Sequence, residues 1–328
     1  MLVDGYRRPV TYLRVSVTDR CNLRCVYCMP PEGIEWQPHA GILRYEEIYA
    51  AVRAAAGLGI RSVRLTGGEP LVRAGLPALV EMLAAIPGIQ EVSLTTNGLL
   101  LEKMAPELAQ AGLKRVNVSL DSLSPERFAR ITRGGSLDQV LRGVQAAEAC
   151  GLTPVKFNVV VLRGVNLDEL LDLAALSFEN KRQVRFIELM PVKNQAPWGE
   201  GFPASGQAYV PAGEILRRLA PLDPQPVAST CGCGPARSYT IAGGRGVIGL
   251  ISPIGDHFCG SCNRLRLTAD GNLRPCLLND QEVPLRPALR AGQPLEPLFE
   301  QAARLKPSGH QLDLRPALGG RSMRQIGG

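Results

Sequence analysis

The sequence predicts an α/β fold organised as a partial, open (β/α)6 barrel of the TIM type, followed by a smaller C-terminal α+β region. Six β-branched runs recur along the first part of the chain, at residues 12–17, 62–66, 91–96, 116–120, 155–162 and 183–189. Segments with helical periodicity separate them, at residues 46–58, 76–86, 101–111 and 137–150. Strand–helix repeats of this length imply parallel strands with right-handed crossovers, and six units are too few for a closed eight-stranded barrel. A flat, doubly wound sheet is the alternative.

The individual elements of this first part follow from composition and spacing. The first strand reads Tyr-Leu-Arg-Val-Ser-Val, in which apolar and polar side chains alternate. The helices repeat apolar residues at the spacing of a helix with one buried face. Ser124-Pro125-Glu126 predicts the start of a further helix, because Ser124 is a good N-cap and proline suits the first turn.

The pattern changes near residue 191. Residues 191–212 are rich in Pro, Gly and aromatic residues, as is typical of a linker or covering loop. Beyond this loop, the periodicity predicts helices and short strands near residues 213–220, 237–241, 246–251, 264–268 and 294–305. We therefore expect a barrel domain over residues 1–195 and a second region over residues 196–328, whose tail ends in two flexible glycines.

Composition and charge narrow the class of protein. The chain of 328 residues has nine cysteines, a formal charge of +7, and neither a signal peptide nor an apolar run long enough to cross a bilayer. Cysteines without a secretory signal favour metal or redox chemistry over disulfides and predict a cytoplasmic protein. The positive charge suits a phosphorylated substrate. It does not indicate nucleic-acid binding, because no dense Lys/Arg block with interleaved aromatic residues is present.

A cysteine triplet, Cys21-x3-Cys25-x2-Cys28, follows the first predicted strand. Three thiolates at this spacing can wrap one loop around an iron–sulfur cube, and one iron then stays open for a small molecule. The alternative is structural zinc, which usually takes four ligands from paired CxxC knuckles; no second knuckle lies nearby. The triplet therefore predicts a cluster that acts on a bound substrate.

A second triplet, Cys259, Cys262 and Cys276, lies near the other end of the chain. It also lacks an obvious fourth thiolate, so it predicts a second cluster with an open iron. A zinc site with one additional ligand is the alternative. The candidates for that ligand are His257, Cys231 and Cys233.

Between these cysteines, the strand pattern puts Arg264 and Arg266 on one face. Two guanidinium groups beside a cluster suit a polyphosphate. The alternative is that both arginines are simply exposed to solvent.

Polar residues gather where the predicted strands end. The groups are Thr66–Pro70, Thr95–Gly98, Ser119–Asp121 and Glu188–Pro191, and Lys156 and Asn158 lie on the fifth strand. Parallel α/β folds place their sites at the carboxyl ends of the strands. The sequence therefore predicts one shared cavity there.

The first triplet, the aromatic residue before its last cysteine and Gly67-Gly68-Glu69-Pro70 resemble the radical S-adenosylmethionine (SAM) superfamily. The resemblance implies that SAM binds the open iron through its amino and carboxylate groups. An electron from the cluster would then cleave the sulfonium to give a 5′-deoxyadenosyl radical. On physical grounds, the glycines let backbone carbonyls approach an ammonium group, and the carboxylate favours its charge.

Within this superfamily the chain resembles, over nearly its full length, the GTP 3′,8-cyclases of molybdenum cofactor biosynthesis. The most specific matches are the Cys-x2-Cys-Asn-Arg-Leu-Arg segment at 259–266, its partner Cys276 and the terminal Gly-Gly. The other matching segments are residues 13–30, 64–73, 95–98, 117–121, 155–158 and 186–191. The resemblance implies that the radical takes hydrogen from C3′ of GTP and that the product is (8S)-3′,8-cyclo-7,8-dihydroguanosine 5′-triphosphate.

The resemblance also implies residue roles. Two [4Fe-4S] clusters would be held by Cys21, Cys25 and Cys28 and by Cys259, Cys262 and Cys276. SAM would contact Tyr27, Gly68, Ser119 and Met190. GTP would contact Arg14, Arg64, Thr95, Lys156, Arg264 and Arg266. The residues expected to assist turnover directly are Arg14, Arg264, Arg266 and the tail glycines Gly327 and Gly328, which would thread towards the cavity.

The implied partners are an electron donor of the flavodoxin or ferredoxin type, a cyclic pyranopterin monophosphate synthase that acts next, and a second copy of the chain in a homodimer. Three cysteines depart from the family pattern. We expect Cys150 to pack in the core at a helix end. We expect Cys231 and Cys233 not to be cluster ligands, because a fourth thiolate would block the iron that the substrate needs.

Two other functions remain as alternatives. One is a peptide-modifying radical SAM maturase with an auxiliary cluster, which would not need the phosphate-binding arginines. The other is a basic zinc protein that binds nucleic acid.

Overall fold

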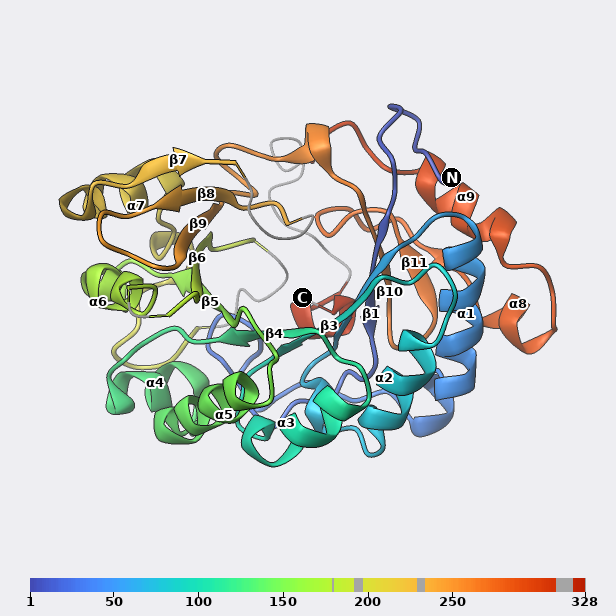
Figure 1. Ribbon diagram of the computed structural model, residues 1–328, viewed down its shortest axis with the longest axis horizontal. Coiled ribbons are helices and arrows are strands. Elements are labelled where there is room, and N and C mark those ends of the chain that lie inside the picture. The colour runs from blue at the N-terminus through green and yellow to red at the C-terminus, as the bar shows by residue number, and fades with distance from the viewer. Residues whose placement is uncertain (179, 192–196, 229–233, 311–320, 328) are drawn as a thin grey trace.

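One continuous sheet of twelve strands runs through the part of the chain that the structure describes (Figure 1). The structure is a computed structural model and describes all residues except 179, 192–196, 229–233, 311–320 and 328. The strand order is β12-β11-β10-β1-β2-β3-β4-β5-β6-β9-β8-β7. The strands from β10 to β9 in this order are parallel, and the two at each edge are antiparallel.

The six central strands agree with the sequence prediction to within one or two residues. They are β1 (Tyr12–Ser16), β2 (Ser62–Thr66), β3 (Glu91–Thr96), β4 (Arg115–Ser119), β5 (Lys156–Val161) and β6 (Gln183–Glu188). The helices between them are α1 (Tyr45–Gly57), α2 (Leu76–Ala84), α3 (Leu101–Gln110), α4 (Pro125–Thr132), α5 (Leu137–Ala149) and α6 (Leu170–Ala175). Ser124 caps α4 as predicted, because its hydroxyl accepts the Arg127 N–H.

The strand order decides between the barrel and the flat sheet. A doubly wound sheet reverses its order beside the first strand and has helices on both faces. Here β1 to β6 follow one another in chain order, and Figure 1 shows α1 to α5 along the outside of the curved sheet. The predicted fold class, a partial open barrel, is therefore confirmed.

The C-terminal region extends both edges of this sheet. At one edge lie β9 (Val247–Ile251), β8 (Arg237–Thr240) and β7 (Gln225–Val227), and at the other lie β10 (Arg264–Leu267), β11 (Asn272–Arg274) and β12 (Val283–Pro284). Its helices are α7 (Ala212–Arg218), α8 (Arg286–Arg290), α9 (Glu296–Arg304) and α10 (Met323–Ile326). The division of the chain at residue 195 stays a prediction. Every helix among the described residues is too short or too polar to cross a membrane.

Side chains along each central strand alternate between two environments. In β1, Leu13 and Val15 are fully buried in the apolar core under the helices. Tyr12 and Arg14 instead line the interior of the barrel. The apolar layer stabilises the fold, and the inner face is left for polar side chains that serve a site.

The residues just before the terminal glycines form a short, buried helix. Residues Met323–Ile326 form the short helix α10, with a capping box between Ser322 and Gln325 at its start. Figure 1 shows this helix, coloured red, at the centre of the barrel. Ile326 is 1% exposed, so this helix is packed into the interior.

Candidate active site

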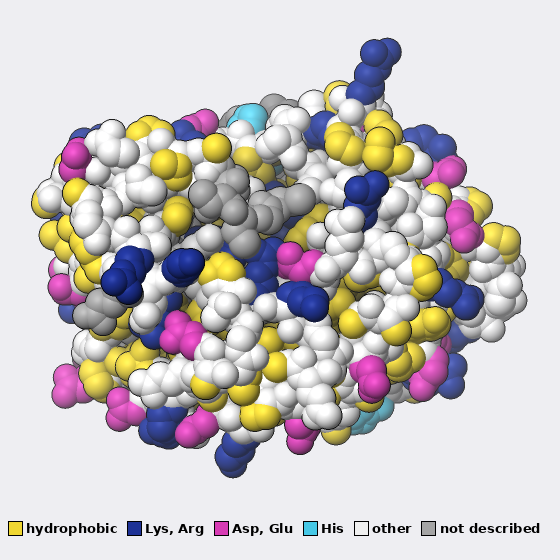
Figure 2. Space-filling model, in the orientation of Figure 1, with side chains coloured by type: hydrophobic (Ala, Val, Ile, Leu, Met, Phe, Trp, Pro, Cys, Tyr) yellow, Lys and Arg dark blue, Asp and Glu magenta, His cyan; other side chains and the backbone are white. Residues whose placement is uncertain are grey.

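A cavity of about 330 Å³ lies on the inner face of the sheet and reaches the loops at the carboxyl ends of the strands. Both cysteine triplets line it. Figure 2 shows Lys and Arg side chains gathered in the hollow at the centre of this face of the molecule. The structure thus joins the predicted strand ends in one cavity, whose size suits a small-molecule site.

The first triplet lies on the loop that leaves β1. A backbone hydrogen bond of 2.9 Å from Val26 N–H to the Ile131 carbonyl ties this loop to α4. Cys21, Cys25 and Cys28 are free thiols, and all three line the cavity. One loop therefore presents three sulfur ligands to one space.

Burial dominates the electrostatics of these thiols. It raises the pKa of Cys21 to about 12 and that of Cys28 to about 11, and it raises the pKa of Cys25 well above the ordinary value. The fields of Cys21 and Cys28 raise the pKa of Cys25 further, so the three groups are close enough to interact. A bound cationic cluster reverses this preference, because its charge favours the thiolate form.

Gly67 and Gly68 allow the loop after β2 to lie directly against the start of the cysteine loop. A Cβ on Gly68 would stand 2.4 Å from the Arg20 carbonyl oxygen, which no side chain can tolerate. The Gly68 N–H donates to the Thr18 carbonyl at 2.8 Å. The glycines are therefore required for loop packing, in addition to any approach to a ligand that the sequence suggested.

Glu69 follows these glycines and is buried. Its carboxylate accepts hydrogen bonds from Thr96 Oγ1 at 2.7 Å, Asn97 N–H at 2.6 Å and Leu71 N–H at 3.0 Å. Burial still raises the pKa of Glu69 to about 7, although these bonds lower it. The side chain thus links the loops after β2 and β3 and lines the cavity.

Tyr27 lies between the last two cysteines of the loop. Its hydroxyl donates to the Asp121 carboxylate at 2.6 Å, and Asp121 also accepts the Val160 N–H at 2.8 Å. Burial raises the pKa of Asp121 to about 6, and the two hydrogen bonds oppose that rise. Asp121 therefore holds the tyrosine against the ends of β4 and β5.

The second triplet lies around β10 and β11. Cys259 opens the short turn η6 (Cys259–Ser261), Cys262 follows that turn, and Cys276 follows β11. The Lys306 ammonium is 3.5 Å from the Cys262 sulfur and donates to the Arg264 carbonyl at 2.8 Å. Burial alone would raise the pKa of Cys262, but Arg264 and Lys306 outweigh it and lower that pKa to about 7.

Three arginines form a row across adjacent strands. The register pairs Arg14 of β1 with Arg266 of β10 on one side and with Arg64 of β2 on the other. Burial, with the neighbouring Arg64 and Arg264 charges, lowers the pKa of Arg14 to about 10. Burial, with the charges of Arg14 and Arg264, also lowers the pKa of Arg266 well below its ordinary value. Cations held this close favour a bound anion, because an anion offsets their mutual repulsion and burial.

Polar atoms without partners mark the other side of the cavity. The Oγ1 of Thr95 and the Oδ1 atoms of Asn117 and Asn158 are buried and accept or donate no hydrogen bond in the structure. All three residues line the cavity. Buried polar atoms are nearly always satisfied in native proteins, so these atoms indicate contacts with a ligand.

Most of the predicted site residues lie in this cavity. Besides the cysteines and arginines above, the lining includes Tyr27, Gly68, Thr95, Ser119 and Met190. Lys156 is fully buried on β5 and does not line the open space, and Gly327 contacts the site through its carbonyl, which accepts from Arg266 at 2.9 Å. Gly328, Cys231 and Cys233 lie outside the described residues. Cys150 packs against the core at the end of α5, as expected.

Five lining or adjacent residues were missed by the sequence reasoning: Arg115, Arg185, Lys306, His310 and Arg324. The alternation of side chains along a strand could have identified Arg115, which shares a strand face with Asn117 and Ser119. The same signal applies to Arg185, whose register partner on β5 is Asn158. The other three come from segments near the C-terminus whose position depends on tertiary contacts.

The donor chemistry fits two iron–sulfur clusters, since each set offers three free thiols to one cavity. The described side chains do not include a group of three or more His, Cys, Asp or Glu residues arranged to hold a single metal ion.

Comparison with known families agrees with this chemistry. The family model of the radical SAM superfamily matches residues 15–176, and the model described as Molybdenum Cofactor Synthesis C matches residues 182–312. The chain is 52% identical to the GTP 3′,8-cyclase of Moorella thermoacetica over 99% of both chains. It is 49% identical to the GTP 3′,8-cyclase of Heliobacterium modesticaldum over the full length of both.

Solved structures share the fold at low sequence identity. Streptococcus suis SuiB bound to S-adenosylmethionine aligns with a TM-score of 0.60 at 15% identity, covering 88% of this chain and 67% of that one. The anSMEcpe protein with bound AdoMet aligns with a TM-score of 0.57 at 17% identity, covering 89% and 78%. The family models and the full-length relatives lead to one conclusion: the chain belongs to the radical SAM superfamily and, within it, to the GTP 3′,8-cyclases, the enzymes of the first step of molybdenum cofactor biosynthesis.

Proposed function

We propose that this protein converts GTP to (8S)-3′,8-cyclo-7,8-dihydroguanosine 5′-triphosphate with SAM and two [4Fe-4S] clusters. The observation that carries the proposal is the row formed by Arg266, Arg14 and Arg64 on neighbouring strands of a cavity that both cysteine triplets line. An enzyme that only cleaved SAM would not need this concentration of buried cations. A triphosphate supplies the matching negative charge.

The first triplet would hold the SAM cluster, and Tyr27, Gly68, Ser119 and Met190 would contact SAM. When bound, the cluster and SAM supply the electron and the hydrogen-abstracting chemistry. The protein's own side chains position the site. Asp121 holds Tyr27 of the cysteine loop in place, and Glu69 joins the loops after β2 and β3. Glu69 also puts a carboxyl group near the place where the ammonium of SAM is expected.

The arginine row would bind the triphosphate of GTP, with Arg264 at the same face. A triphosphate carries about four negative charges, and cations desolvated around it offset the cost of one another's burial. Thr95 offers a buried hydroxyl without a partner for a sugar or base contact. Lys156, fully buried behind the lining, would add positive charge to the site without direct exposure to the cavity.

The second triplet would hold its cluster beside the guanine. Lys306 lowers the cost of a thiolate at Cys262, and the Gly327 carbonyl orients the Arg266 guanidinium. We propose that this carbonyl is how the tail assists turnover. An apolar group of Met190, Leu278 and Ile326 excludes water nearby, which protects a carbon radical from unintended hydrogen donors.

The finer assignments of partners belong to the same proposal. The enzyme would take its electron from a flavodoxin or ferredoxin and pass its product to a cyclic pyranopterin monophosphate synthase. We also propose that it works as a homodimer in the cytoplasm. Co-purification would test the identity of the electron donor. Sedimentation of the reconstituted protein would test the homodimer.

The activity is tested by an anaerobic reaction of the reconstituted protein with SAM, dithionite and GTP deuterated at C3′. Deuterium is expected in the 5′-deoxyadenosine product, read by mass spectrometry. Unlabelled 5′-deoxyadenosine would reject GTP as the hydrogen donor and favour a peptide-modifying maturase. The absence of 5′-deoxyadenosine from protein with full iron content would reject radical SAM chemistry itself.

A further inference from the structure

The C-terminal helix α10 lies between the two cysteine triplets. Ile326 and Met323 pack in one apolar group with Met190 and with Cys276 of the second triplet. At the end of the helix, the Gly327 carbonyl accepts a hydrogen bond from Arg266. The helix thus contacts both Cys276 of the second triplet and Arg266 of the arginine row.

The same helix also reaches the first triplet, through Arg324. Burial raises the pKa of the Cys28 thiol, and the charge of Arg324 opposes this rise, so the two groups lie close together. Arg324 is the second residue of α10. The tail therefore reaches a cysteine that the proposed function makes a ligand of the SAM cluster.

The Arg324 side chain lies at the same place. It is 2% exposed, lines the cavity with Cys21 and Cys28, and donates to the Ile34 carbonyl at 2.9 Å. Its Nε is buried and has no hydrogen-bond partner in the structure. A buried N–H donor without an acceptor costs free energy unless a ligand accepts from it. A cluster held by Cys21 and Cys28, which line the same cavity, would bring sulfur acceptors to this part of the site.

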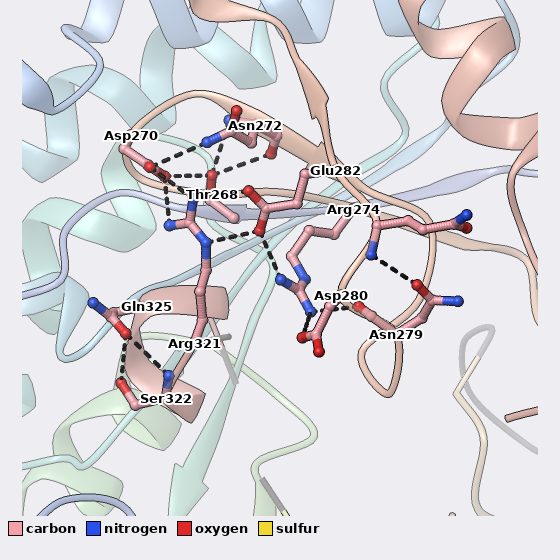
Figure 3. Close-up of polar contacts among 11 residues, drawn as sticks. Thr268, Asp270, Asn272, Arg274, Asn279, Asp280, Glu282, Arg321, Ser322 and Gln325 are labelled. Carbon is pink, nitrogen blue, oxygen red and sulfur yellow. Dashed lines mark hydrogen bonds and ion pairs between the residues drawn. The ribbon is translucent and has the colours of Figure 1, made fainter. Parts of the chain in front are cut away.

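A clamp outside the cavity holds α10 in this position (Figure 3). Arg321, just before the helix, donates to Asp270 at 3.0 and 2.8 Å and to Glu282 at 2.8 Å. Glu282 in turn accepts from the fully buried Arg274 at 2.6 Å. Because Asp270 and Glu282 flank β11 and β12, the helix is attached to the edge of the sheet and not only to the cavity.

We infer that Arg324 is a positioning residue that raises the reduction potential of the SAM cluster, through a buried guanidinium that lines the cavity with Cys21 and Cys28 and keeps its Nε donor without a partner. Hydrogen bonds and positive charge near cluster sulfurs stabilise the reduced, more negative form. The inference rests on the proposed function, since it assumes a cluster on the first triplet. The tail then has a second role: when α10 is docked, the SAM cluster is easier to reduce.

The test is a redox titration of full-length, reconstituted wild type, Arg324→Gln, Arg324→Lys and a control, Arg304→Gln. Arg304 is exposed on α9 and pairs only weakly with Glu300, so the control removes one charge far from the cavity. The signal followed is the part of the reduced-cluster EPR spectrum that SAM changes. Iron content and SAM binding are measured on each sample.

At the solution potential that reduces half of the wild-type clusters, we expect well under half to be reduced in Arg324→Gln. The midpoint potential of Arg324→Lys should lie between those of wild type and Arg324→Gln, because lysine keeps the charge and loses the Nε donor. The midpoint of the control should match that of wild type. A wild-type midpoint in Arg324→Gln overturns the inference, as does a Lys variant that is shifted as far as the Gln variant. If Arg324→Gln does not load iron, a wild-type midpoint in Arg324→Lys overturns it. A wild type without a SAM-responsive signal instead defeats the proposed function.

Discussion

Arg14 of β1 and Arg266 of β10 occupy paired positions on adjacent parallel strands, and both side chains line one cavity. The charge of Arg14 lowers the pKa of Arg266, after the larger effect of burial. The two residues are about 250 positions apart in the sequence. The fold therefore concentrates positive charge at a cost, which a bound anion would reduce.

Arg14→Gln is expected to weaken GTP binding by about ten- to a hundredfold, the loss of a charge-assisted hydrogen bond. The same change should leave the ligand-free protein as stable as wild type or more stable, because repulsion with Arg266 is relieved. Isothermal titration with GTP and thermal unfolding measure the two effects. Arg142→Gln, an exposed arginine paired with Glu102 on the helical side, is the matched control. Equal losses of binding in both variants would contradict the assignment of Arg14.

Gly68→Ala is expected to destabilise the protein by about 1–3 kcal/mol, because the new methyl group overlaps the Arg20 carbonyl. The displaced backbone belongs to the cysteine loop, so iron content should fall as well. Thermal unfolding and iron analysis of the reconstituted protein check both. Gly213→Ala has open space around its Cβ and should be neutral or slightly stabilising. Wild-type iron content in Gly68→Ala would show that the close approach is not needed.

Cys262 is expected to react faster than Cys21, Cys25, Cys28 and Cys259 in the metal-free, reduced protein near neutral pH. Its pKa is about 7, whereas burial raises the pKa of Cys21 to about 12 and that of Cys28 to about 11. The thiolate is the nucleophile, so the alkylation rate at Cys262 should rise about tenfold from pH 6 to pH 8. Mass spectrometry after timed iodoacetamide treatment reads each site.

Lys306→Gln removes a cation that lies beside Cys262 and should raise the pKa of this thiol. The pH of half-maximal alkylation then increases. Lys103→Gln, on the exposed side of α3, should leave the profile unchanged. A profile of Cys262 that stays the same in Lys306→Gln would mean that Arg264 alone sets it.

Asp270→Asn is expected to loosen the clamp on α10. Burial opposes ionisation of Asp270, but hydrogen bonds from Arg321 and Thr268 outweigh it and lower its pKa. A lowered pKa in the folded state means that the carboxylate stabilises the clamp above its ordinary pKa of about 4, and that this stabilisation is lost as the pH falls through the lowered value. The asparagine variant carries a neutral side chain at every pH and should lack this contribution.

Trypsin measures the loosening, since Arg324 is buried in the clamped tail. Cleavage after Arg324 should become about tenfold faster in Asp270→Asn, read by intact mass. Glu300→Gln breaks only an exposed pair with Arg304 and serves as the control. An unchanged cleavage rate would show that Glu282 alone holds Arg321.

Much of the barrel could be predicted because its signals are local. The β-branched runs, the Ser124 cap and the cysteine spacing each lie within a few residues of the element they define. The strand alternation also indicated that Arg264 and Arg266 share a face, and both line the cavity. Very short elements, such as β7 and β12, carry too few residues for a periodic signal.

The sequence by itself determined the six strand–helix units, the two sets of three thiols and the arginines of β10. Only the tertiary structure decided that β10 pairs with β1, that Lys306 and Arg324 reach the two triplets, and that Met323–Ile326 form a helix packed inside the barrel. The physical reason is distance along the chain. Periodicity and spacing report which face of an element is buried, whereas contacts between distant segments depend on the packing of the whole sheet.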